Sequence, residues 1–442
     1  MHVPDGFINA PVSAGTGAVA AVAVAVSLRG ARRELSGGPG EAGERTAPLA
    51  GLVAAFIFAV QMLNFPVAAG TSGHLLGGAL AAILVGPYTG VLCVSVVLLL
   101  QGVLFADGGL TALGVNITDM GVVTVLVAYG IFRGLLRLLP RARSSVTIAS
   151  FVAALVSVPA AATAFTGIYA LGGTTDVALG KVFAAMVGVH VLIGIGEAAI
   201  TALTVGAVVA VRPDLVYAAR DRLAVRLELR TSPFATPGAA ARAASGPAPE
   251  PASAPASESA PASGSAPEPA QEPESAPGAE SAPGAGPAPG PAAGASPRRR
   301  SVRPLWITGI IVTVLCAGGL SFYASASPDG LEKVAADNGI DEKAKDHSAK
   351  DSPLADYGVK DISSARLSGG LAGVIGAGAT LALGSGVFVV LRRRRAEPSS
   401  RVEAPSRAEA PSRAEPSSRA TAQDPARPSD GSGASEPSGA ER

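Results

Sequence analysis

The stretch LLGGALAAILVGPYTGVLCVSVVLLLQGVLFA, residues 75–106, decides how many times this chain crosses a membrane. A membrane-spanning helix needs roughly 17–25 apolar residues, so this run is too long for one comfortable helix. Gly86 and Pro87 interrupt it, and these residue types mark a turn. The run is therefore either one long helix or two short ones, and the choice sets the side of the membrane on which every later loop lies.

Apolar runs of spanning length recur along the chain, which has 48% hydrophobic residues although one long stretch of it is plainly polar. Such a concentration of apolar residues is typical of a helical membrane protein. The sequence predicts membrane helices near residues 10–28, 47–69, 75–106, 117–136, 146–170, 183–211, 304–326 and 367–391.

Arginine placement decides how to count residues 75–106, because cytoplasmic loops are enriched in Lys and Arg. Arginines follow the first apolar run within residues 29–46, which places that loop in the cytoplasm and the N-terminus outside. A single helix over 75–106 would put the arginines of residues 133–143 outside, whereas two short helices keep them inside. We therefore predict seven spans within residues 1–211.

The rest of the chain divides into a linker, a small membrane module and a tail. Within the linker at residues 212–303, residues 232–300 are almost entirely Pro, Ala, Ser, Glu and Gly, and such a segment cannot bury enough apolar surface to offset its ordering entropy. We expect it to be a disordered cytoplasmic linker. Residues 304–395 contain two apolar runs joined by a loop on the outside, and residues 396–442 are expected to be a disordered cytoplasmic tail.

The expected fold is an all-α polytopic protein of the cell membrane, with a bundle of about seven helices tethered to a two-helix module. Its N-terminus would be extracytoplasmic and its C-terminus cytoplasmic. No basic segment precedes the first apolar run, so we expect no removable signal sequence. We also expect Met1 to be retained, because a bulky second residue such as His2 disfavours removal of the initiator.

The first two residues offer a chelating group. His2 follows Met1, so a free α-amine, a backbone amide nitrogen and an imidazole lie within chelating reach of one another. Three nitrogens in linked small rings suit a divalent late transition metal such as Ni²⁺ or Co²⁺. The alternative interpretation is a start codon followed by a chance histidine, since short motifs often match by chance.

His74 is a candidate for a further nitrogen ligand. It lies in a turn of Gly and Ser residues that enters a helix, and the predicted topology puts this turn on the same side as Met1 and His2. A turn of small residues lets another segment approach closely, so the N-terminal peptide could fold onto it. A histidine that caps a helix at the membrane interface is an equally good interpretation of the spacing.

Five further polar residues are candidates for supporting such ligands, because a metal-bound histidine usually donates its second ring N–H to a polar partner. His190 and Glu197 share a helix face, and a carboxylate at that depth should face the bundle interior with a partner. The alternatives are a buried interhelical hydrogen bond for His190 and helix capping by Asn116 or Thr118. The five candidates are Asn64, Asn116, Asp119, His190 and Glu197.

Several classes of function are disfavoured. A net charge of +1 gives no reason to expect nucleic-acid binding. The chain has no Gly-x-x-x-x-Gly-Lys-Ser/Thr sequence, so it does not bind ATP through a P-loop, and no nucleophile–base constellation indicates an enzyme. We expect no permanent cofactor. Cys93 and Cys316 lie inside apolar runs and are expected to be free thiols.

Three separated motifs resemble the cobalt/nickel substrate-binding component of energy-coupling factor transporters, the CbiM/NikM type. They lie in residues 1–7, 64–78 and 190–198, and the resemblance covers about residues 1–211. The sequence Ser-Pro-Asp-Gly-Leu-Glu-Lys at 327–333 is similar to the small two-helix accessory component, the CbiN/NikN type, which carries a Pro-Asp-Gly-Leu-Glu motif. The chain thus resembles a fusion of both.

The resemblance implies a cobalt or nickel ion bound by the N-terminal amine and amide nitrogens and by two imidazoles, here those of Met1, His2 and His74. It also implies a membrane coupling protein and two cytoplasmic ATPases on separate chains, and an accessory component that helps to load the metal. The family more often has Asn where this chain has Asp119, and this extra carboxylate would alter metal preference or cap the helix.

Two alternatives stand beside the substrate-capture component of an ATP-driven uptake transporter. A stand-alone divalent-cation permease or channel would transport without partner ATPases and would need more paired intramembrane carboxylates than Glu197 and Asp119 provide. A metal sensor or membrane scaffold would need signalling content in the cytoplasmic segments, which are instead low in complexity. The uptake component is the interpretation that fits best.

Overall fold

The computed structural model of the chain describes residues 1–35, 43–68, 70–223, 303–325 and 327–393, all of which belong to one compact unit. Most of the linker and the tail that the sequence predicts to be disordered lie outside these described residues. Both cysteines are free thiols, as predicted.

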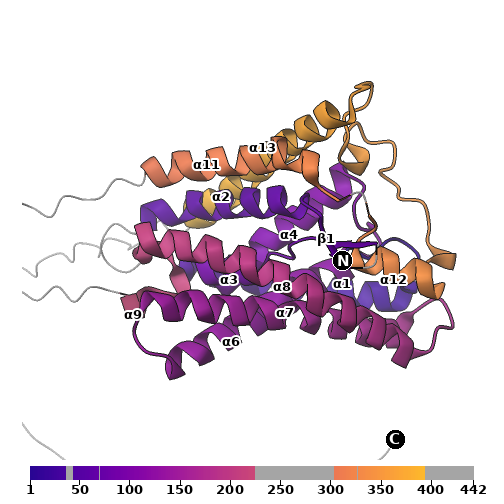
Figure 1. The fold of residues 1–442 in the computed structure, drawn as a ribbon, viewed down its shortest axis with the longest axis horizontal. Helices are drawn as coiled ribbons and strands as arrows, with labels where there is room; N and C mark the ends of the chain where they lie inside the picture. The colour runs from indigo at the N-terminus through magenta and orange to yellow at the C-terminus, as the bar shows by residue number, and fades with distance from the viewer. Residues whose placement is uncertain (36–42, 69, 224–302, 326, 394–442) are drawn as a thin grey trace, which may run out of the picture. The chain divides into compact units, whose positions relative to one another are not determined.

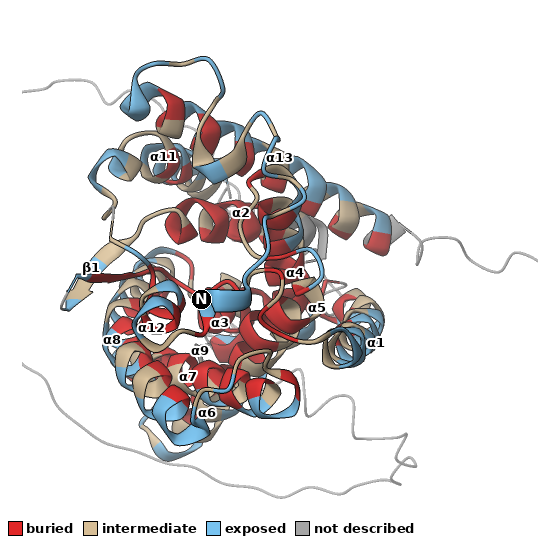
Figure 2. Ribbon diagram, turned by 90° about the vertical axis from the view of Figure 1, so that its right-hand side faces the viewer, coloured by how far each residue is buried: buried red, intermediate tan, exposed pale blue. Residues whose placement is uncertain are grey.

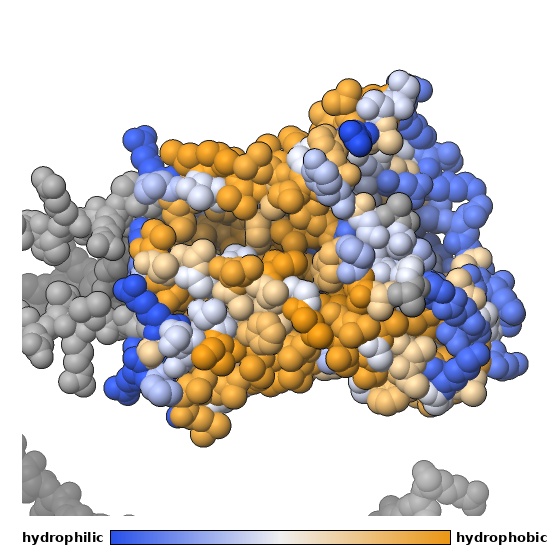
Figure 3. Space-filling view, viewed as in Figure 1, coloured by the Kyte–Doolittle hydropathy of each residue, from blue (hydrophilic) through white to orange (hydrophobic). Residues whose placement is uncertain are grey.

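Seven helical segments of the described chain are long and apolar enough to cross a membrane. Figure 3 shows apolar side chains over the middle of the visible face and hydrophilic side chains gathered at its two ends. A bilayer with water on both sides requires such a band, and the predicted all-α membrane fold is confirmed. The segments are α1 (Ala10–Glu34), α4 (Pro87–Leu104), Leu113–Leu138, α7 (Arg143–Gly172), α8 (Leu179–Val211), Arg303–Tyr323 and α13 (Ala365–Arg393).

Two of these segments are composite. Leu113–Leu138 joins α5 (Leu113–Asn116), the π-helix η1 (Ile117–Val123) and α6 (Thr124–Leu138), and Arg303–Tyr323 joins α11 (Arg303–Gly318) to the 3-10 helix η4 (Leu320–Tyr323). The remaining elements are α2 (Gly43–Gln61), β1 (Phe65–Ala68), β2 (Thr71–Gly73), α3 (Gly78–Val85), α9 (Arg220–Leu223), α12 (Gly330–Asn338) and the 3-10 turns η2 (Pro213–Leu215), η3 (Tyr217–Ala219), η5 (Asp341–Lys343) and η6 (Ala355–Tyr357).

The apolar run 75–106 breaks at Gly86, as the sequence predicts, and α3 and α4 meet there. Gly86 has φ 99° and ψ 160°, a conformation that is essentially restricted to glycine. The eight residues of α3 extend only about 12 Å, so α3 alone cannot cross a hydrocarbon core of about 30 Å. The predicted pair of short spans is therefore one span, α4, and one shorter helix whose residues are all buried.

The span expected over residues 47–69 is also shorter than predicted, because α2 ends at Gln61 and the chain becomes extended at Phe65. Pro66 accounts for the extended conformation at Phe65, since proline lacks a backbone N–H and disfavours a helical conformation in the residue before it. β1 pairs antiparallel with β2, and Phe65 lies opposite Gly73. The hairpin brings His74 back to the bundle directly after β2.

The C-terminal helices α11 and α13 pack along α2, and Figure 1 shows the three side by side. Their backbones approach closely: a Cβ added at Gly51 would lie 2.2 Å from the Ser385 hydroxyl, and one added at Gly376 would lie 2.2 Å from the Phe58 ring. Close packing of small residues is a main source of helix association in lipid. The two membrane modules therefore form one bundle.

The two ends of this bundle differ. In Figure 1 the N-terminus, β1 and α12 lie at one end, and α9 lies at the other. Figure 2 looks onto the first of these ends and shows the N-terminus near its centre, whereas α1 lies at the periphery. The first residue of the chain is thus enclosed by elements from both modules.

Glu34 fixes the opposite end by linking α1 to the start of α4. Its carboxylate accepts hydrogen bonds from the Tyr88 N–H at 3.2 Å, the Thr89 N–H at 2.7 Å and the Thr89 hydroxyl at 2.7 Å. A Cβ added at Gly86 would lie 2.6 Å from the carboxyl carbon of Glu34. Glycine is therefore required at this turn both for its conformation and for its size.

We expect Gly86→Ala to destabilise the protein by about 1–3 kcal/mol, because alanine is strained at this positive φ and its methyl group collides with Glu34. Thermal unfolding of the purified protein in detergent measures the effect. Gly130→Ala in α6 is the control, since a Cβ there meets nothing within 4 Å and alanine favours a helix. Equal melting temperatures for the two variants would contradict this role of Gly86.

Candidate metal centre

The residues before α1 run into the bundle, so that Met1 and Val3 are only 2% and 0% exposed. The Asn116 side chain makes two hydrogen bonds with the Val3 backbone: its Oδ1 accepts from the Val3 N–H at 2.8 Å, and its Nδ2 donates to the Val3 carbonyl at 3.2 Å. The Gly109 N–H donates to the same carbonyl at 2.9 Å. These contacts fix the backbone immediately after Met1 and His2.

A second set of contacts holds the following residues. The Asp5 carboxylate accepts from the Thr111 N–H at 2.8 Å, and the Gly6 carbonyl accepts from the Thr174 hydroxyl at 2.7 Å. Gly6 has φ 92°, and a Cβ there would lie 2.3 Å from the Lys343 carbonyl oxygen. The N-terminal peptide is therefore clamped between the helical bundle and the loop that follows α12.

The amine of Met1 is the centre of the site. It donates to Nε2 of His74 at 2.5 Å and to Oδ2 of Asp329 at 2.7 Å. His74 and Asp329 are 4% and 8% exposed, so these contacts lie largely out of reach of water. The structure thus brings together Met1 and His74, which the sequence singles out, and adds a carboxylate from the C-terminal module.

His74 is oriented by its surroundings. Its Nδ1 donates to the Leu75 carbonyl at 3.0 Å, which leaves Nε2 as the atom that faces the amine. Glu197 holds the next turn, because its carboxylate accepts from the Leu76 N–H at 2.6 Å and from the Gly77 N–H at 3.2 Å. Glu197 therefore supports the segment that carries His74 from a neighbouring helix.

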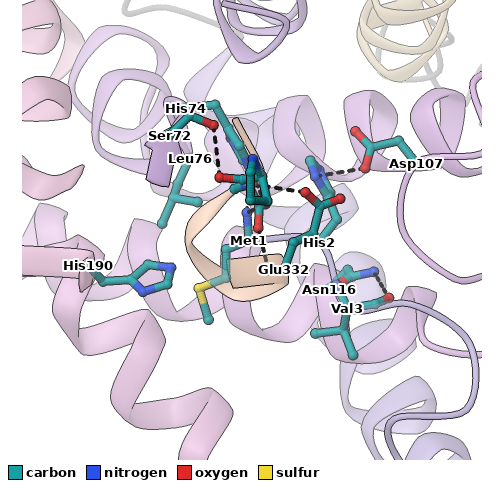
Figure 4. A network of polar contacts seen from close by, with 12 residues as sticks. Met1, His2, Val3, Ser72, His74, Leu76, Asp107, Asn116, His190 and Glu332 are labelled. Atoms are coloured by element: carbon teal, nitrogen blue, oxygen red, sulfur yellow. Dashed lines mark hydrogen bonds and ion pairs between the residues drawn. The ribbon is translucent and has the colours of Figure 1, made fainter. Parts of the chain in front are cut away.

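His2 lies over His74, with the ring centroids 5.0 Å apart and the planes 14° from parallel. Its Nδ1 pairs with Oδ1 of Asp107 at 3.0 Å, as Figure 4 shows. Oδ2 of Asp107 in turn accepts from the Tyr357 hydroxyl at 2.6 Å. Nε2 of His2 is buried and has no hydrogen-bond partner among the residues that the structure describes.

This orientation of His2 has a consequence for chelation. A small ring that joins the His2 amide nitrogen to its imidazole closes through Nδ1, the ring nitrogen nearer the backbone. Nδ1 faces Asp107 here, so the imidazole must turn about its Cβ–Cγ bond before amine, amide and imidazole can hold one cation.

The charges of the site favour a cation. Burial by itself would raise the pKa of Asp329, but the N-terminal ammonium and His74 hold that pKa well below its usual range. For Asp107, His2 and Tyr357 outweigh burial and lower the pKa to about 2. Burial lowers the pKa of His74, and the neighbouring ammonium lowers it further. At neutral pH the two carboxylates are ionised and His74 is an uncharged imidazole.

Asp329 is held in place by a capping box at the start of α12. Its Oδ1 accepts from the Glu332 N–H at 2.8 Å, and the Glu332 carboxylate accepts from the Asp329 N–H at 2.9 Å. Ser72 in β2 donates its N–H to the Pro328 carbonyl at 2.9 Å. One carboxylate oxygen of Asp329 thus caps the helix, and the other is presented to the amine.

The loop after α12 covers the N-terminal peptide. The Lys345 N–H donates to the Asp5 carbonyl at 2.8 Å, and Nε2 of His347 contacts the Gly108 carbonyl at 3.0 Å. The Ser352 hydroxyl donates to the Leu104 carbonyl at 2.6 Å. The C-terminal module therefore closes the end of the bundle where the site lies.

The other sequence candidates take different places. Asn116 does not cap a helix, because its side chain holds Val3. His190 makes its hydrogen bond within α8, to the Met186 carbonyl at 2.7 Å, and the alternative of an interhelical hydrogen bond is not observed among the described residues. Asn64 lies before β1, where its carbonyl accepts from the Ser325 N–H at 2.7 Å.

Asp119 is 1% exposed within the π-helix η1, and neither carboxylate oxygen has a hydrogen-bond partner among the described residues. Single turns of π-helix occur often at functional sites. A capping role for this side chain is not observed.

Asp107, Asp329 and Tyr357 escaped the sequence reasoning as site residues. Asp329 was noticeable only as part of a motif, and Asp107 only as an acid in a short loop between two apolar runs. Their contacts join residues separated by more than 100 positions, so no local spacing reveals them.

Comparisons with known proteins agree with this division into two modules. The family model described as the cobalt uptake substrate-specific transmembrane region matches residues 2–215, and the model of the PDGLE domain matches residues 303–393.

Three relatives illustrate the similarity. A provisionally named metal transport protein of Haloquadratum walsbyi is 40% identical over 219 residues, which are 49% of this chain and 94% of the relative. A provisionally named fused nickel transport protein, NikMN, of Archaeoglobus fulgidus is 40% identical over 219 residues, 49% of this chain and 68% of the relative. The cobalt transport protein CbiM of Sorangium cellulosum is 34% identical over 231 residues, 51% of this chain and 96% of the relative.

We expect Asn116→Ala to weaken binding of Co²⁺ or Ni²⁺ by about 10–100-fold, because the Val3 backbone loses both of its hydrogen bonds to the Asn116 side chain while the metal-facing groups remain. Equilibrium titration of the purified chain measures this change. Thr118→Ala is the control, since its hydroxyl contacts only the Thr16 carbonyl at 3.3 Å. If Asn116→Ala and Thr118→Ala both bind the metal as tightly as the wild type, the hydrogen bonds between Asn116 and Val3 do not contribute to metal binding.

Proposed function

Because this chain belongs to the family of cobalt uptake substrate-specific transmembrane proteins and carries a PDGLE domain, we propose that it captures cobalt or nickel outside the cytoplasm for ATP-driven import. It is a multi-pass membrane protein and a subunit of a cobalt or nickel transporter. In this proposal residues 1–211 form the capture module and residues 304–395 the accessory module.

The observation that carries the proposal is the buried cluster of Met1, His2 and His74. The amine of Met1 lies 2.5 Å from Nε2 of His74, and the ring of His2 lies over that of His74. Late transition metals favour nitrogen ligands of this kind. The cation replaces the hydrogen bond between amine and imidazole, and both nitrogens become its ligands once the amine has lost its proton.

The remaining ligands are the amide nitrogen and the imidazole of His2. Turning the His2 ring away from Asp107 brings Nδ1 to the same side as the amine and gives four nitrogens in a roughly planar arrangement. Asn116 and Glu197 act as positioning residues, because Asn116 fixes the backbone at Val3 and Glu197 fixes the turn after His74. A planar nitrogen site leans towards nickel, and cobalt is also accepted.

The orientation in the membrane is supported by the arginines. Arg29, Arg32 and Arg33 lie at the end of α1, and Arg220 and Arg222 lie in α9, at the end of the bundle opposite the N-terminus. Cytoplasmic loops are enriched in such residues. We therefore place Met1 on the extracytoplasmic side and the C-terminus in the cytoplasm.

The source of energy lies on other chains in this proposal. As the resemblance to the CbiM/NikM type implies, a membrane coupling protein and two cytoplasmic ATPases are the partners that drive the release of the cation inwards. The lack of a P-loop in this sequence agrees with that assignment. The alternative, a stand-alone permease, needs none of these partners. Uptake of radioactive nickel into vesicles that hold only this chain distinguishes the two, and we expect none without the partners.

We expect His2→Ala and His74→Ala each to abolish binding of one Ni²⁺ or Co²⁺ per chain, and blocking the amine to weaken it more than about 100-fold, because each change removes a nitrogen ligand. Metal analysis and titration of the purified protein measure this. His347→Ala is the control, since among the described residues the His347 ring hydrogen-bonds to the Gly108 carbonyl and the Ala349 N–H and to none of the proposed ligands. An N-terminally extended chain with full affinity would show that the amine is not a ligand.

We also expect the affinity for Co²⁺ to fall at least about tenfold when the pH is lowered from about 7.5 to about 5.5, because protons compete with the metal for nitrogen ligands. The pKa values of Asp107 and Asp329 are lowered, so both carboxylates stay ionised in this interval and do not contribute to the fall. Titration at each pH measures the change, and a constant affinity would argue against nitrogen ligands.

A further inference from the structure

We propose that His2, His74 and Asp329 form a loading site for the divalent cation, in which the cation binds before the N-terminal amine and amide take it over. This inference rests on the proposed function and adds a ligand from the C-terminal module. It assigns a chemical role to the first acid of the Pro-Asp-Gly-Leu-Glu motif, namely that of a transient oxygen ligand to the transported metal.

The positions of the three side chains carry the proposal. Each offers one ligand atom, and the three atoms lie within 4.8 Å of one another. Oδ2 of Asp329 is 3.5 Å from Nε2 of His74. Two ligands that are each about 2.1 Å from one cation lie about 3.0–3.4 Å apart, so the spacing of this pair already suits a shared cation. The amine of Met1 contacts both atoms, so it moves aside when the cation enters.

His2 is the member that must move. Asp107 holds its Nδ1, and Tyr357 of the C-terminal module holds Asp107, so the partner-free atom Nε2 is the one available to a cation. A carboxylate on the second ring nitrogen is the usual support for a metal-bound histidine. Because a cation lies in the plane of the imidazole that binds it, one of the two stacked rings tilts when the cation is shared.

The two states of the site then differ in which ring nitrogen of His2 binds the cation. In the loading site the imidazole binds through Nε2 and keeps its bond to Asp107. In the final chelate it binds through Nδ1, and the bond to Asp107 is broken. When this ring turns, the ammonium and the His2 amide each release one proton to water, and their nitrogens replace the Asp329 oxygen on the cation. The cation thereby passes from a site with two nitrogens and one oxygen to one with four nitrogens.

The choice of ligands fits a temporary site. Asp329 and Asp107 bring two negative charges against one ammonium, and this excess attracts a dication. A site of two imidazoles and one carboxylate holds Ni²⁺ or Co²⁺ less tightly than four nitrogens, so the cation moves on instead of remaining. The Asp329 carboxylate is also preorganised, because the Glu332 N–H donates a hydrogen bond to Oδ1 and so leaves Oδ2 for the cation.

The first test is the rate of metal loading in the full chain held in lipid nanodiscs. Co²⁺ is mixed rapidly with the wild type, Asp329→Asn and the control Asp337→Asn, which changes an exposed acid at the other end of α12. Asparagine is a good N-cap, so α12 is retained. We expect Asp329→Asn to slow loading at least about tenfold, and the control to slow it less than about twofold. Equal rates for the wild type and Asp329→Asn would overturn the proposal.

The second test removes the amine as a ligand. A chain that keeps the formyl group on Met1 cannot form the four-nitrogen site, but it retains the three side chains of the loading site. We expect it to bind one Co²⁺ weakly, and to lose this binding in Asp329→Asn and in His74→Ala but not in Asp337→Asn. Weak binding that ignores Asp329, or no binding at all to a formylated chain that melts like the wild type, would overturn the loading site.

The two proposals fail in different ways. Full affinity in the formylated chain, or no metal bound by the unblocked wild type, would overturn the proposed capture function. A wild type that binds tightly and loads at the same rate with or without the Asp329 carboxylate would leave capture intact and overturn only the loading site.

Discussion

The structure depends on the burial of a positive charge, the ammonium group of Met1, between His74 and Asp329. A buried charge without partners costs several kcal/mol, so the rest of the site has to supply partners on every side. A carboxylate at 2.7 Å and an imidazole nitrogen at 2.5 Å do so. The same requirement that stabilises the ammonium prepares a group of donors for a dication, because each partner of a buried cation is also a candidate metal ligand.

The need to place partners around the Met1 ammonium also explains the conformation of several other segments. For Met1 to arrive at the centre of the bundle, the residues behind it must be extended and held, and Asn116 does this at Val3. His74 must return towards the amine, which the hairpin of β1 and β2 achieves after α2 ends at Gln61. Glu197 then secures the turn into α3. Each of these polar contacts lies in or near the apolar band, where unsatisfied backbone groups are most costly.

The C-terminal module is part of the site as well as of the bundle. α11 and α13 pack on α2 through small residues, and α12 and its following loop close the end of the bundle over the N-terminal peptide. Asp329 and Tyr357 reach the two residues at the start of the chain from this module, one directly and one through Asp107. Because both modules belong to one chain, each capture module has one accessory module to supply Asp329 and Tyr357.

The sequence alone determined the class of the protein, because apolar length and arginine placement are governed by the bilayer and act locally. It located the break at Gly86, since only glycine adopts that backbone conformation readily, and it singled out Met1, His2 and His74 by residue type. Only the tertiary structure decided that α3 is a buried half-length helix and that α2 ends before a hairpin. It also decided which nitrogen of His2 is free and that Asp329 and Asp107 complete the site. The contacts of His2, Asp107 and Asp329 join side chains that are more than 100 residues apart in sequence, and contacts at that separation leave no periodicity or spacing from which they could be predicted.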